Sequence, residues 1–288
     1  MRNPVTLKAL RRQLIERFRA GGFESPDIEA RLILLAVTGF TPTELVTQRE
    51  ARLAPPLCRK IERFVSRRLS GEPLDHILGQ KEFYGRPFKV SQDVLSPRPE
   101  TEGVVDHALK LLERVKRPQI LDLGTGSGAI LITLMAERPD AQGIGVDISA
   151  PALAIARENA RSLHVEARCD WRKGDWFDPV LATEKFDLIL SNPPYITDMA
   201  MEDLSPEVTN YDPDIALRGG ADGLNAYRAI LEHAGDYLKP DGAIIFEIGY
   251  DQGVSVSKCV ASSGFANVKC YQDLSGHDRV VIGTQLDH

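Results

Sequence analysis

The sequence predicts an α/β protein with a mostly parallel sheet and an antiparallel C-terminal strand, preceded by a small helical bundle. Three observations favour this fold. Apolar residues recur at helical spacing through the first 76 residues. From residue 119 onward, short apolar segments alternate with helical ones, as in a parallel sheet. Two apolar segments near the end, 266–271 and 279–282, flank a glycine-containing loop and indicate a closing antiparallel pair.

The N-terminal segment is expected to form three long helices and one short helix. Cap residues, first-turn prolines and terminal glycines mark the helix ends: Thr6, Gly21-Gly22, Ser25-Pro26, Gly39, Thr41-Pro42, Pro55-Pro56 and Ser70-Gly71. The apolar residues between these markers fall on one face of each helix, which indicates a packed core.

A hairpin is expected to join this bundle to the rest of the chain, because two short β-prone segments flank a turn at Gly85-Arg86-Pro87. The expected domains are therefore a helical domain at 1–76, a hairpin linker at 77–95 and a catalytic domain at 96–288. The catalytic domain should contain strands at 120–123, 143–146, 186–190 and 243–248, and helices at 104–112, 129–136, 150–160, 224–238 and 254–260.

Composition and charge narrow the classes of function. The 288 residues carry a net charge of −6, yet residues 1–78 hold 14 Lys and Arg against nine Asp and Glu, so the remainder is strongly acidic. An acidic catalytic half argues against a protein that grips duplex DNA along its phosphates. No apolar segment reaches membrane-span length, and the four scattered cysteines show neither metal-ligand nor redox spacing. We expect a cytoplasmic protein with no bound metal, and a monomer by default.

The sequence Asn192-Pro193-Pro194-Tyr195 follows an apolar segment that predicts a buried strand. Two consecutive prolines cannot donate to a sheet, so the strand must stop there and continue as a stiff loop. The Asn192 carboxamide and the Pro193 carbonyl can then be held at fixed positions. Two fixed acceptors suit a planar NH2 group, which has two hydrogens to donate.

A glycine-rich turn, Gly124-Thr125-Gly126-Ser127-Gly128, joins a predicted strand to a predicted helix. Ligands in such folds bind beyond the carboxyl ends of the strands. Asp147 ends the next strand, where a carboxylate can accept hydrogen bonds from both ribose hydroxyls. The glycine spacing differs from the dinucleotide pattern G-x-G-x-x-G, and Asp122 precedes the turn, where its charge would repel a phosphate.

A cationic nucleoside without phosphates, such as S-adenosylmethionine, suits this site better, because its sulfonium and ammonium groups favour nearby carboxylates. Asp175 and Trp176 follow a third predicted strand and could supply a hydrogen bond and a flat face for adenine. A core role for Trp176 is the alternative, since large aromatic residues are usually buried.

These motifs together resemble the class I methyltransferases, and more narrowly the HemK/PrmC family of peptide chain release factor N5-glutamine methyltransferases. The matching stretches are VSQDVLSPRPETE, ILDLGTGSGAILITLMAERP, VDISAPALAIARENA, GDWF and FDLILSNPPYI. The match extends from about residue 83 to the end, whereas residues 1–75 match in helical character only. One departure is Ser96, where the family usually has an aliphatic residue.

The resemblance implies that the glycine turn, Asp147 and Trp176 line a site for S-adenosylmethionine, with S-adenosylhomocysteine as product. It implies that residues 192–195 bind the glutamine of the Gly-Gly-Gln loop in class-1 release factors, and that the helical domain recognises this partner. Arg98, Thr101 and Glu102, in a proline-stiffened loop before a helix, are expected to form a lid or wall over the ligand. No specific role is assigned to Glu100, Glu102 or Glu247 beyond a structural or ligand-positioning one.

Three alternatives are compatible with parts of the pattern. The Asn-Pro-Pro-Tyr element also fits methyltransferases that act on a ribosomal-protein glutamine or on the adenine amino group of nucleic acid. The acidic catalytic half and the lack of a DNA-reading domain count against the nucleic-acid substrate. A binding or scaffold protein without turnover is the third alternative, and the presence of both motifs intact argues against it.

Overall fold

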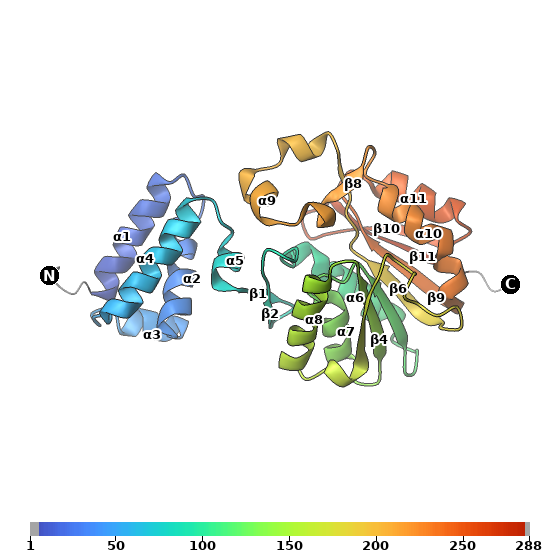
Figure 1. Cartoon of the computed structure of the whole chain (residues 1–288), viewed down its shortest axis with the longest axis horizontal. Coiled ribbons are helices and arrows are strands. Elements are labelled where there is room, and N and C mark those ends of the chain that lie inside the picture. Colours follow the sequence, from blue (N-terminus) through green and yellow to red (C-terminus); the bar gives the residue numbers. More distant parts are fainter. Residues whose placement is uncertain (1–5, 286–288) are drawn as a thin grey trace. The chain divides into compact units, whose positions relative to one another are not determined.

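The structure, a computed structural model, describes residues 6–285 and divides between Gly79 and Gln80 into two compact units (Figure 1). None of the helices found between residues 6 and 285 has the length and apolar character needed to cross a membrane. Each unit has its own hydrophobic core.

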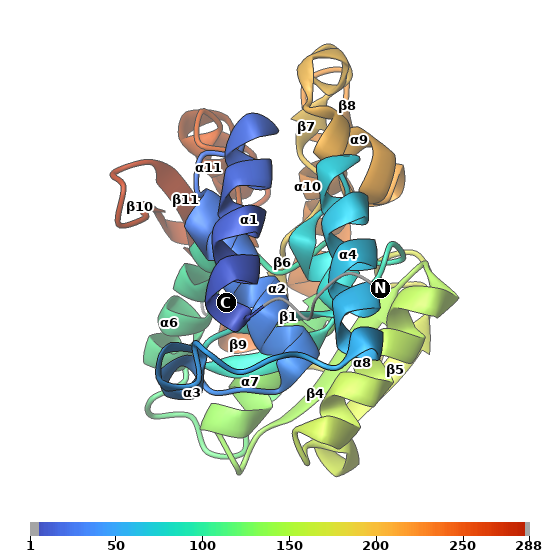
Figure 2. The ribbon, with the colours of Figure 1, turned by 90° about the vertical axis from the view of Figure 1, so that its left-hand side faces the viewer.

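The first unit is a bundle of helices: α1 (Leu7–Ala20), α2 (Pro26–Thr38), α3 (Pro42–Thr47), α4 (Pro55–Leu69) and α5 (Leu74–Leu78). Helix α2 packs against both α1 and α4, as Figures 1 and 2 show. The four helices predicted from the sequence are confirmed, whereas the short α5 was not predicted.

The predicted helix ends are formed by the local chemistry expected of them. The Thr6 hydroxyl accepts a hydrogen bond from the amide of Ala9, and Thr41 forms a reciprocal capping box with Glu44. Gly39 closes α2 at φ +71°, a left-handed conformation that glycine adopts without steric cost. The paired prolines lie inside the first turn of α4, where their missing N–H groups leave no helical hydrogen bond unmade.

The second unit is built on a sheet whose order is β10-β11-β9-β6-β3-β4-β5. Its strands are β3 (Gln119–Leu123), β4 (Gln142–Asp147), β5 (Cys169–Lys173), β6 (Phe186–Ser191), β9 (Leu238–Glu247), β10 (Ala266–Gln272) and β11 (Asp278–Thr284). The first five are parallel to one another, and β11 pairs antiparallel with both β9 and β10. The predicted fold class, a mostly parallel sheet closed by antiparallel C-terminal strands, is confirmed.

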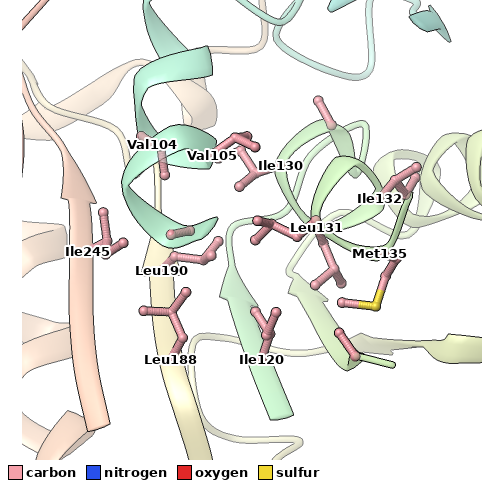
Figure 3. Close-up of a cluster of buried hydrophobic side chains, with 14 of the residues drawn as sticks. Val104, Val105, Ile120, Ile130, Leu131, Ile132, Met135, Leu188, Leu190 and Ile245 are labelled. Atoms are coloured by element: carbon pink, nitrogen blue, oxygen red, sulfur yellow. The ribbon is translucent and has the colours of Figure 1, made fainter. Parts of the chain in front are cut away.

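Helices cover both faces of this sheet. Helices α6 (Glu102–Leu111), α7 (Ala129–Glu137) and α8 (Ala150–Ser162) lie on one face, and α10 (Asn225–Tyr237) and α11 (Gly253–Ser262) on the other. Alternate residues of one strand enter the two cores: Leu188 and Leu190 of β6 face α6 and α7, as Figure 3 shows, whereas Ile189 faces α10. Strands buried on both faces explain the continuous apolar segments in the sequence.

The predicted hairpin forms at the start of the second unit, but its turn differs from the prediction. Strands β1 (Gln80–Phe83) and β2 (Arg86–Lys89) are joined by Tyr84 and Gly85, both with positive φ. Arg86 and Pro87 therefore belong to the second strand, because a two-residue turn with two positive φ values matches the twist of a hairpin. The hairpin is fastened to α8, since the Lys89 amide and carbonyl both bond to the Asn159 carboxamide, at 2.7 and 3.1 Å.

Two further differences lie in the C-terminal half of the chain. The helix predicted at 224–238 ends close to where it was expected, at Tyr237, but the strand predicted at 243–248 begins earlier, because β9 starts at Leu238 and continues through residues 239–242. Within these residues the register of β9 shifts against β6, and Asp241 takes a positive φ of +62°.

The segment after Tyr195 was not predicted at all. It contains the short parallel pair β7 (Ile196–Thr197) and β8 (Arg218–Gly220), with helix α9 (Pro206–Tyr211) between them. Figure 2 shows this segment as a lobe beside α10. The lobe returns the chain to the end of β6, close to the loop that the sequence singled out.

Candidate functional site

A cavity of about 690 Å³ opens at the carboxyl ends of β3, β4 and β6. This volume is in the range of small-molecule sites, and the position is the point where the strand order reverses on either side of β3. Most of the residues predicted from the sequence line it: Arg98, Thr101, Gly124, Thr125, Gly126, Ser127, Asp147, Asp175, Trp176, Asn192 and Pro194. Gly128, Pro193, Tyr195 and Glu102 do not.

The glycine turn adopts a backbone that side chains would resist. Gly124, Gly126 and Gly128 have φ values of +70°, +56° and +78°. Gly128 serves packing, because a Cβ there would lie 2.7 Å from Cδ1 of Ile132 and 3.0 Å from the Trp171 ring. The turn therefore presents its backbone to the cavity through Gly124 and Gly126, and uses Gly128 to bring α7 close to the sheet.

Asp147 holds the turn in place. Its Oδ2 accepts a hydrogen bond from the Gly126 amide and its Oδ1 accepts one from the Ser149 amide, both at 2.8 Å. Burial raises the pKa of Asp147, and these two amides oppose the rise. Each carboxylate oxygen keeps a second lone pair, so the side chain can still accept hydrogen bonds from a ligand's hydroxyl groups.

Asp175 and Trp176 lie just beyond the end of β5. Asp175 is exposed, and Trp176 is half-buried with φ +39°, an uncommon conformation for a bulky residue. The Trp176 ring lies beside the glycine turn, since a Cβ on Gly124 would be 3.7 Å from its Cζ3. Trp176 packs against the core, as the alternative interpretation expected, and also lines the cavity, while its contact with adenine stays a prediction.

Asn192 stands at the end of β6 and faces the same cavity. The preceding Ser191 is buried, and its hydroxyl donates to the Leu123 carbonyl at 2.6 Å. This bond joins the end of β6 to the end of β3, directly before the glycine turn. Asn192 is thereby held at the same edge of the sheet as the glycine turn, and both line the cavity. Pro193 is buried beside it.

Tyr195 is held by a network that the sequence did not reveal. The Gln252 Nε2 donates to the carbonyls of Tyr195 and Gly223, both at 3.2 Å, and its Oε1 accepts from the Gly249 amide at 3.0 Å. A Cβ on Gly223 would lie 2.4 Å from the Tyr195 carbonyl oxygen, so only glycine permits this approach. Gln252 lies in a loop without a recognisable motif, and no pattern in the sequence could have identified it.

Glu247, the last residue of β9, is buried near Asn192 with an exposed fraction of 2%. Burial raises its pKa to about 7, and the Thr101 hydroxyl, Arg279 and the Asn192 carboxamide oppose this rise. Even so, within residues 6–285, Oε2 of Glu247 has no hydrogen-bond partner of acceptable geometry.

Asp122 lies beneath the glycine turn, outside the cavity lining. It is 1% exposed and accepts a hydrogen bond from the Thr125 hydroxyl at 2.6 Å. Burial raises the pKa of Asp122 to about 7. Its charge at neutral pH is therefore only partial, which weakens the expectation that it repels a phosphate directly.

Two further segments, 93–98 and 213–218, also line the cavity. An ion pair between Arg98 and the buried carboxylate of Asp212, at 3.1 Å, joins them. Arg98 and Thr101 occupy the wall position expected of them. Glu102 instead accepts a hydrogen bond from the Tyr84 amide at 2.7 Å and secures the hairpin.

The charge on the cavity wall fits a cationic ligand. Its two cationic residues are already paired: Arg98 with Asp212, and Arg218 with Asp198 and Asp214. The carboxylates of Asp93, Asp147 and Asp175 have no Lys or Arg partner anywhere in the described chain. A nucleoside carrying positive charge and no phosphate therefore fits this cavity, whereas a pyrophosphate would meet unpaired carboxylates.

Two family models match the chain. A model described as the PrmC N-terminal domain matches residues 9–79, and a model described as a methyltransferase domain matches residues 115–258. The first match falls within the helical unit and the second within the unit that contains the cavity.

Several relatives of this chain share the name release factor glutamine methyltransferase. The chain is 43% identical over 270 residues to a release factor glutamine methyltransferase of Caulobacter vibrioides, with 94% of this chain and 93% of the relative covered. It is 42% identical over 264 residues to the release factor glutamine methyltransferase of Neisseria gonorrhoeae, covering 91% of this chain and 95% of that protein.

Solved structures of methyltransferases have a similar fold over about three quarters of the chain. A methyltransferase from Pyrococcus furiosus superposes with a TM-score of 0.52 at 16% identity, covering 77% of this chain and 98% of that one. A 16S rRNA N2 G1207 methyltransferase of Thermus thermophilus, solved with AdoMet and guanosine, gives a TM-score of 0.51 at 16% identity. That match covers 72% of this chain and 49% of the other. At this identity the likeness concerns the fold alone.

Proposed function

The chain belongs to the family of release factor glutamine methyltransferases, and on this basis we propose that it methylates the glutamine of the Gly-Gly-Gln loop in class-1 peptide chain release factors. The acceptor atom is the side-chain amide nitrogen of that glutamine. The modification would act on translation termination, since it alters the loop by which these factors work.

The methyl donor is S-adenosylmethionine, which supplies an electrophilic methyl group on a sulfonium and leaves as S-adenosylhomocysteine. Asp147 accepts hydrogen bonds from the ribose hydroxyls, and the backbone of Gly124 and Gly126 allows close approach. Asp175 and Trp176 bind the adenine by a hydrogen bond and a flat contact. The unpaired carboxylates of the cavity wall favour the positive charge of this ligand.

An amide nitrogen is a poor nucleophile because its lone pair is delocalised into the carbonyl group. Asn192 lines the cavity, and Pro193 and Tyr195 follow it in the same loop outside the lining. In the proposed complex the side-chain oxygen of Asn192 and the carbonyl of Pro193 accept the two hydrogens of the amide nitrogen and draw it toward pyramidal geometry. Its lone pair is then available for the methyl group, and Tyr195 packs against the amide plane. The chain contributes orientation and fixed dipoles: the bond from nitrogen to the methyl carbon forms as the bond from that carbon to sulfur breaks, and the cationic nitrogen then loses one proton to water.

The observation that carries this proposal is the position of Asn192, whose side chain lines the same cavity as Asp147 and the glycine turn. A donor and an acceptor amide can therefore meet within one cavity. Ser191 fixes this juxtaposition through its bond to Leu123, at the base of the turn.

Replacing Asn192 by Ala tests the assignment. We expect turnover to fall about 10²–10³-fold, by analogy with the loss of one preorganised polar contact to a transition state. Affinity for S-adenosylmethionine should change much less. The assay measures transfer of labelled methyl groups to purified release factor, and calorimetry measures donor binding. Near-normal turnover in the variant would refute the role of Asn192.

The choice of substrate requires a separate experiment. The wild-type enzyme is given labelled donor with release factor, ribosomes or duplex DNA in parallel, and mass spectrometry locates the methyl group. Label confined to the Gly-Gly-Gln glutamine supports the proposal. Label on a ribosomal protein or on adenine, with none on release factor, would replace it.

We further propose that the helical unit binds the release factor outside its Gly-Gly-Gln loop, because the loop alone offers little surface. The basic surplus of residues 1–78 is compatible with an acidic partner surface. The reaction would take place in the cytoplasm, where translation factors work, with the enzyme acting as a monomer.

A further inference from the structure

Glu247 is a buried carboxylate that the mechanism above does not use. Its neighbour Phe246 pairs with Ser191 of β6, so Glu247 and Asn192 stand at the same level at the ends of adjacent parallel strands. Ile245 belongs to the core beneath α6, and because side chains alternate along a strand, Glu247 points to that same face. Glu247 therefore lies between Asn192 and Thr101, which precedes α6.

Two polar atoms at this point have no partner within the described chain: Oε2 of Glu247 and Oγ1 of Thr101. Both side chains are buried, at 2% and 4% exposure. Buried polar atoms are nearly always hydrogen-bonded in folded proteins, so the unpartnered Oε2 of Glu247 requires an explanation. A well-packed apolar residue would be less costly here if the position served the core alone.

We propose that Glu247 is a positioning residue, whose carboxylate accepts a hydrogen bond from the NH2 group of Asn192 and thereby holds the Asn192 oxygen toward the substrate amide. The inference rests on the proposed function and deepens it. A carboxamide has one accepting oxygen and one donating NH2 group. A neighbour that can only accept will engage the NH2 group and leave the oxygen directed into the cavity, as substrate binding requires.

The ionisation state of Glu247 decides this orientation. Burial raises the pKa of Glu247 to about 7, with Glu100 adding to the rise and Thr101, Arg279 and Asn192 opposing it. Tyr195 and Tyr227 are the other titratable groups that face it. Once protonated, Glu247 can donate to the Asn192 oxygen and turn the carboxamide the wrong way. Activity should therefore be present above about pH 7 and be lost as the pH falls through that value.

The test uses the full-length Glu247→Gln variant and wild-type enzyme with release factor. The neutral isostere can donate to the Asn192 oxygen, so we expect kcat to fall about 10- to 100-fold, as for partners that orient a reacting group. The acidic limb of the pH profile should disappear. KM for release factor and affinity for S-adenosylmethionine should change less than kcat.

Glu100→Gln is the matched control. Glu100 is an exposed carboxylate whose charge raises the pKa of Glu247 without lining the cavity. Its removal should leave kcat at high pH unchanged and move the acidic limb to lower pH. A double variant adds a second check. Once Asn192 is Ala, introducing Glu247→Gln should change kcat by less than about twofold, because the group that it orients is gone.

A measurement on wild-type protein keeps the inference testable if the Gln variant does not fold. The NMR resonances of the Asn192 side-chain NH2, assigned with Asn192→Ala, should titrate with the midpoint of the acidic limb. Resonances independent of pH, or a Gln variant that retains full kcat and its acidic limb, would overturn the inference. Absence of methyl transfer by wild-type enzyme would instead refute the proposed function.

Discussion

Asp147 offers the most direct test of the donor site. In the structure its carboxylate holds the Gly126 and Ser149 amides at 2.8 Å and, in the proposed complex, also accepts the ribose hydroxyls. Hydrogen bonds to a charged acceptor contribute about 1.5–3 kcal/mol. Asp147→Ala should therefore raise the Kd for S-adenosylmethionine about 10- to 150-fold.

Two comparisons separate the ribose contact from simple charge attraction. S-adenosylhomocysteine has the same ribose and lacks the sulfonium charge, so its affinity should fall by a similar factor if the contact is to the hydroxyl groups. A much smaller loss would indicate that Asp147 acts by long-range attraction to the sulfonium. Asp147→Asn keeps an accepting oxygen without the charge and should have an intermediate Kd.

Titration calorimetry with both ligands measures these affinities, and urea unfolding of the free proteins measures the cost of losing the two backbone bonds. Asp178→Ala is the control, because it removes an exposed carboxylate three residues from Asp175 that does not line the cavity. It should bind as wild type does. Unchanged affinity in Asp147→Ala would mean that the ribose lies elsewhere.

Three further predictions follow from the fold. Asp122→Asn should be more stable than wild type at neutral pH, since the pKa of Asp122 is raised from 3.8 to about 7 in the folded protein. A carboxyl group whose pKa is raised by folding destabilises the folded state increasingly as the pH rises from its pKa in the unfolded chain to its pKa in the folded protein. The stability advantage of the variant, measured by urea unfolding, should therefore grow between about pH 4 and pH 7 and then level off. A stability advantage that does not change with pH would contradict the burial argument. Gly128→Ala should lower the free energy of unfolding by about 1–3 kcal/mol, because the residue has φ +78° and its Cβ would lie 2.7 Å from Ile132; wild-type stability in urea would show that α7 can move away at no cost. Deleting residues 1–79 should raise KM for release factor far more than KM for the donor, and equal effects on both would count against a substrate-binding role for the helical unit.

Local sequence patterns were sufficient to predict most of the secondary structure in both units. Thr6, Thr41 and Gly39 mark helix ends by short-range chemistry, and the apolar periodicity between them needs no distant partner. The strands of the parallel sheet were equally clear, because strands buried on both faces are apolar throughout. Differences arose where a distant segment overrides local preference, as at 239–242, where pairing with β6 extends β9 through a proline and a glycine.

The residues at the ends of β3, β4 and β6 were also predictable, since parallel strands deliver their carboxyl ends to one edge of a sheet. Gly124, Asp147 and Asn192 do line one cavity. The sequence could not predict that the glycines of this turn have different roles. Gly128 faces Ile132 and Trp171 instead of the cavity, and only the packing of α7 on the sheet reveals this.

By itself, the sequence determined the fold class, the family and most of the residues that line the cavity, because these depend on local spacing and on rules of strand connection. The tertiary structure alone decided which carboxylates are buried and unpaired. Gln252, 57 residues from Tyr195, secures that loop, and Glu247 comes beside Asn192 only through the pairing of β9 with β6. Contacts between segments far apart in the chain, and the loss of solvent that raises a pKa, leave no periodic signature in the order of residues.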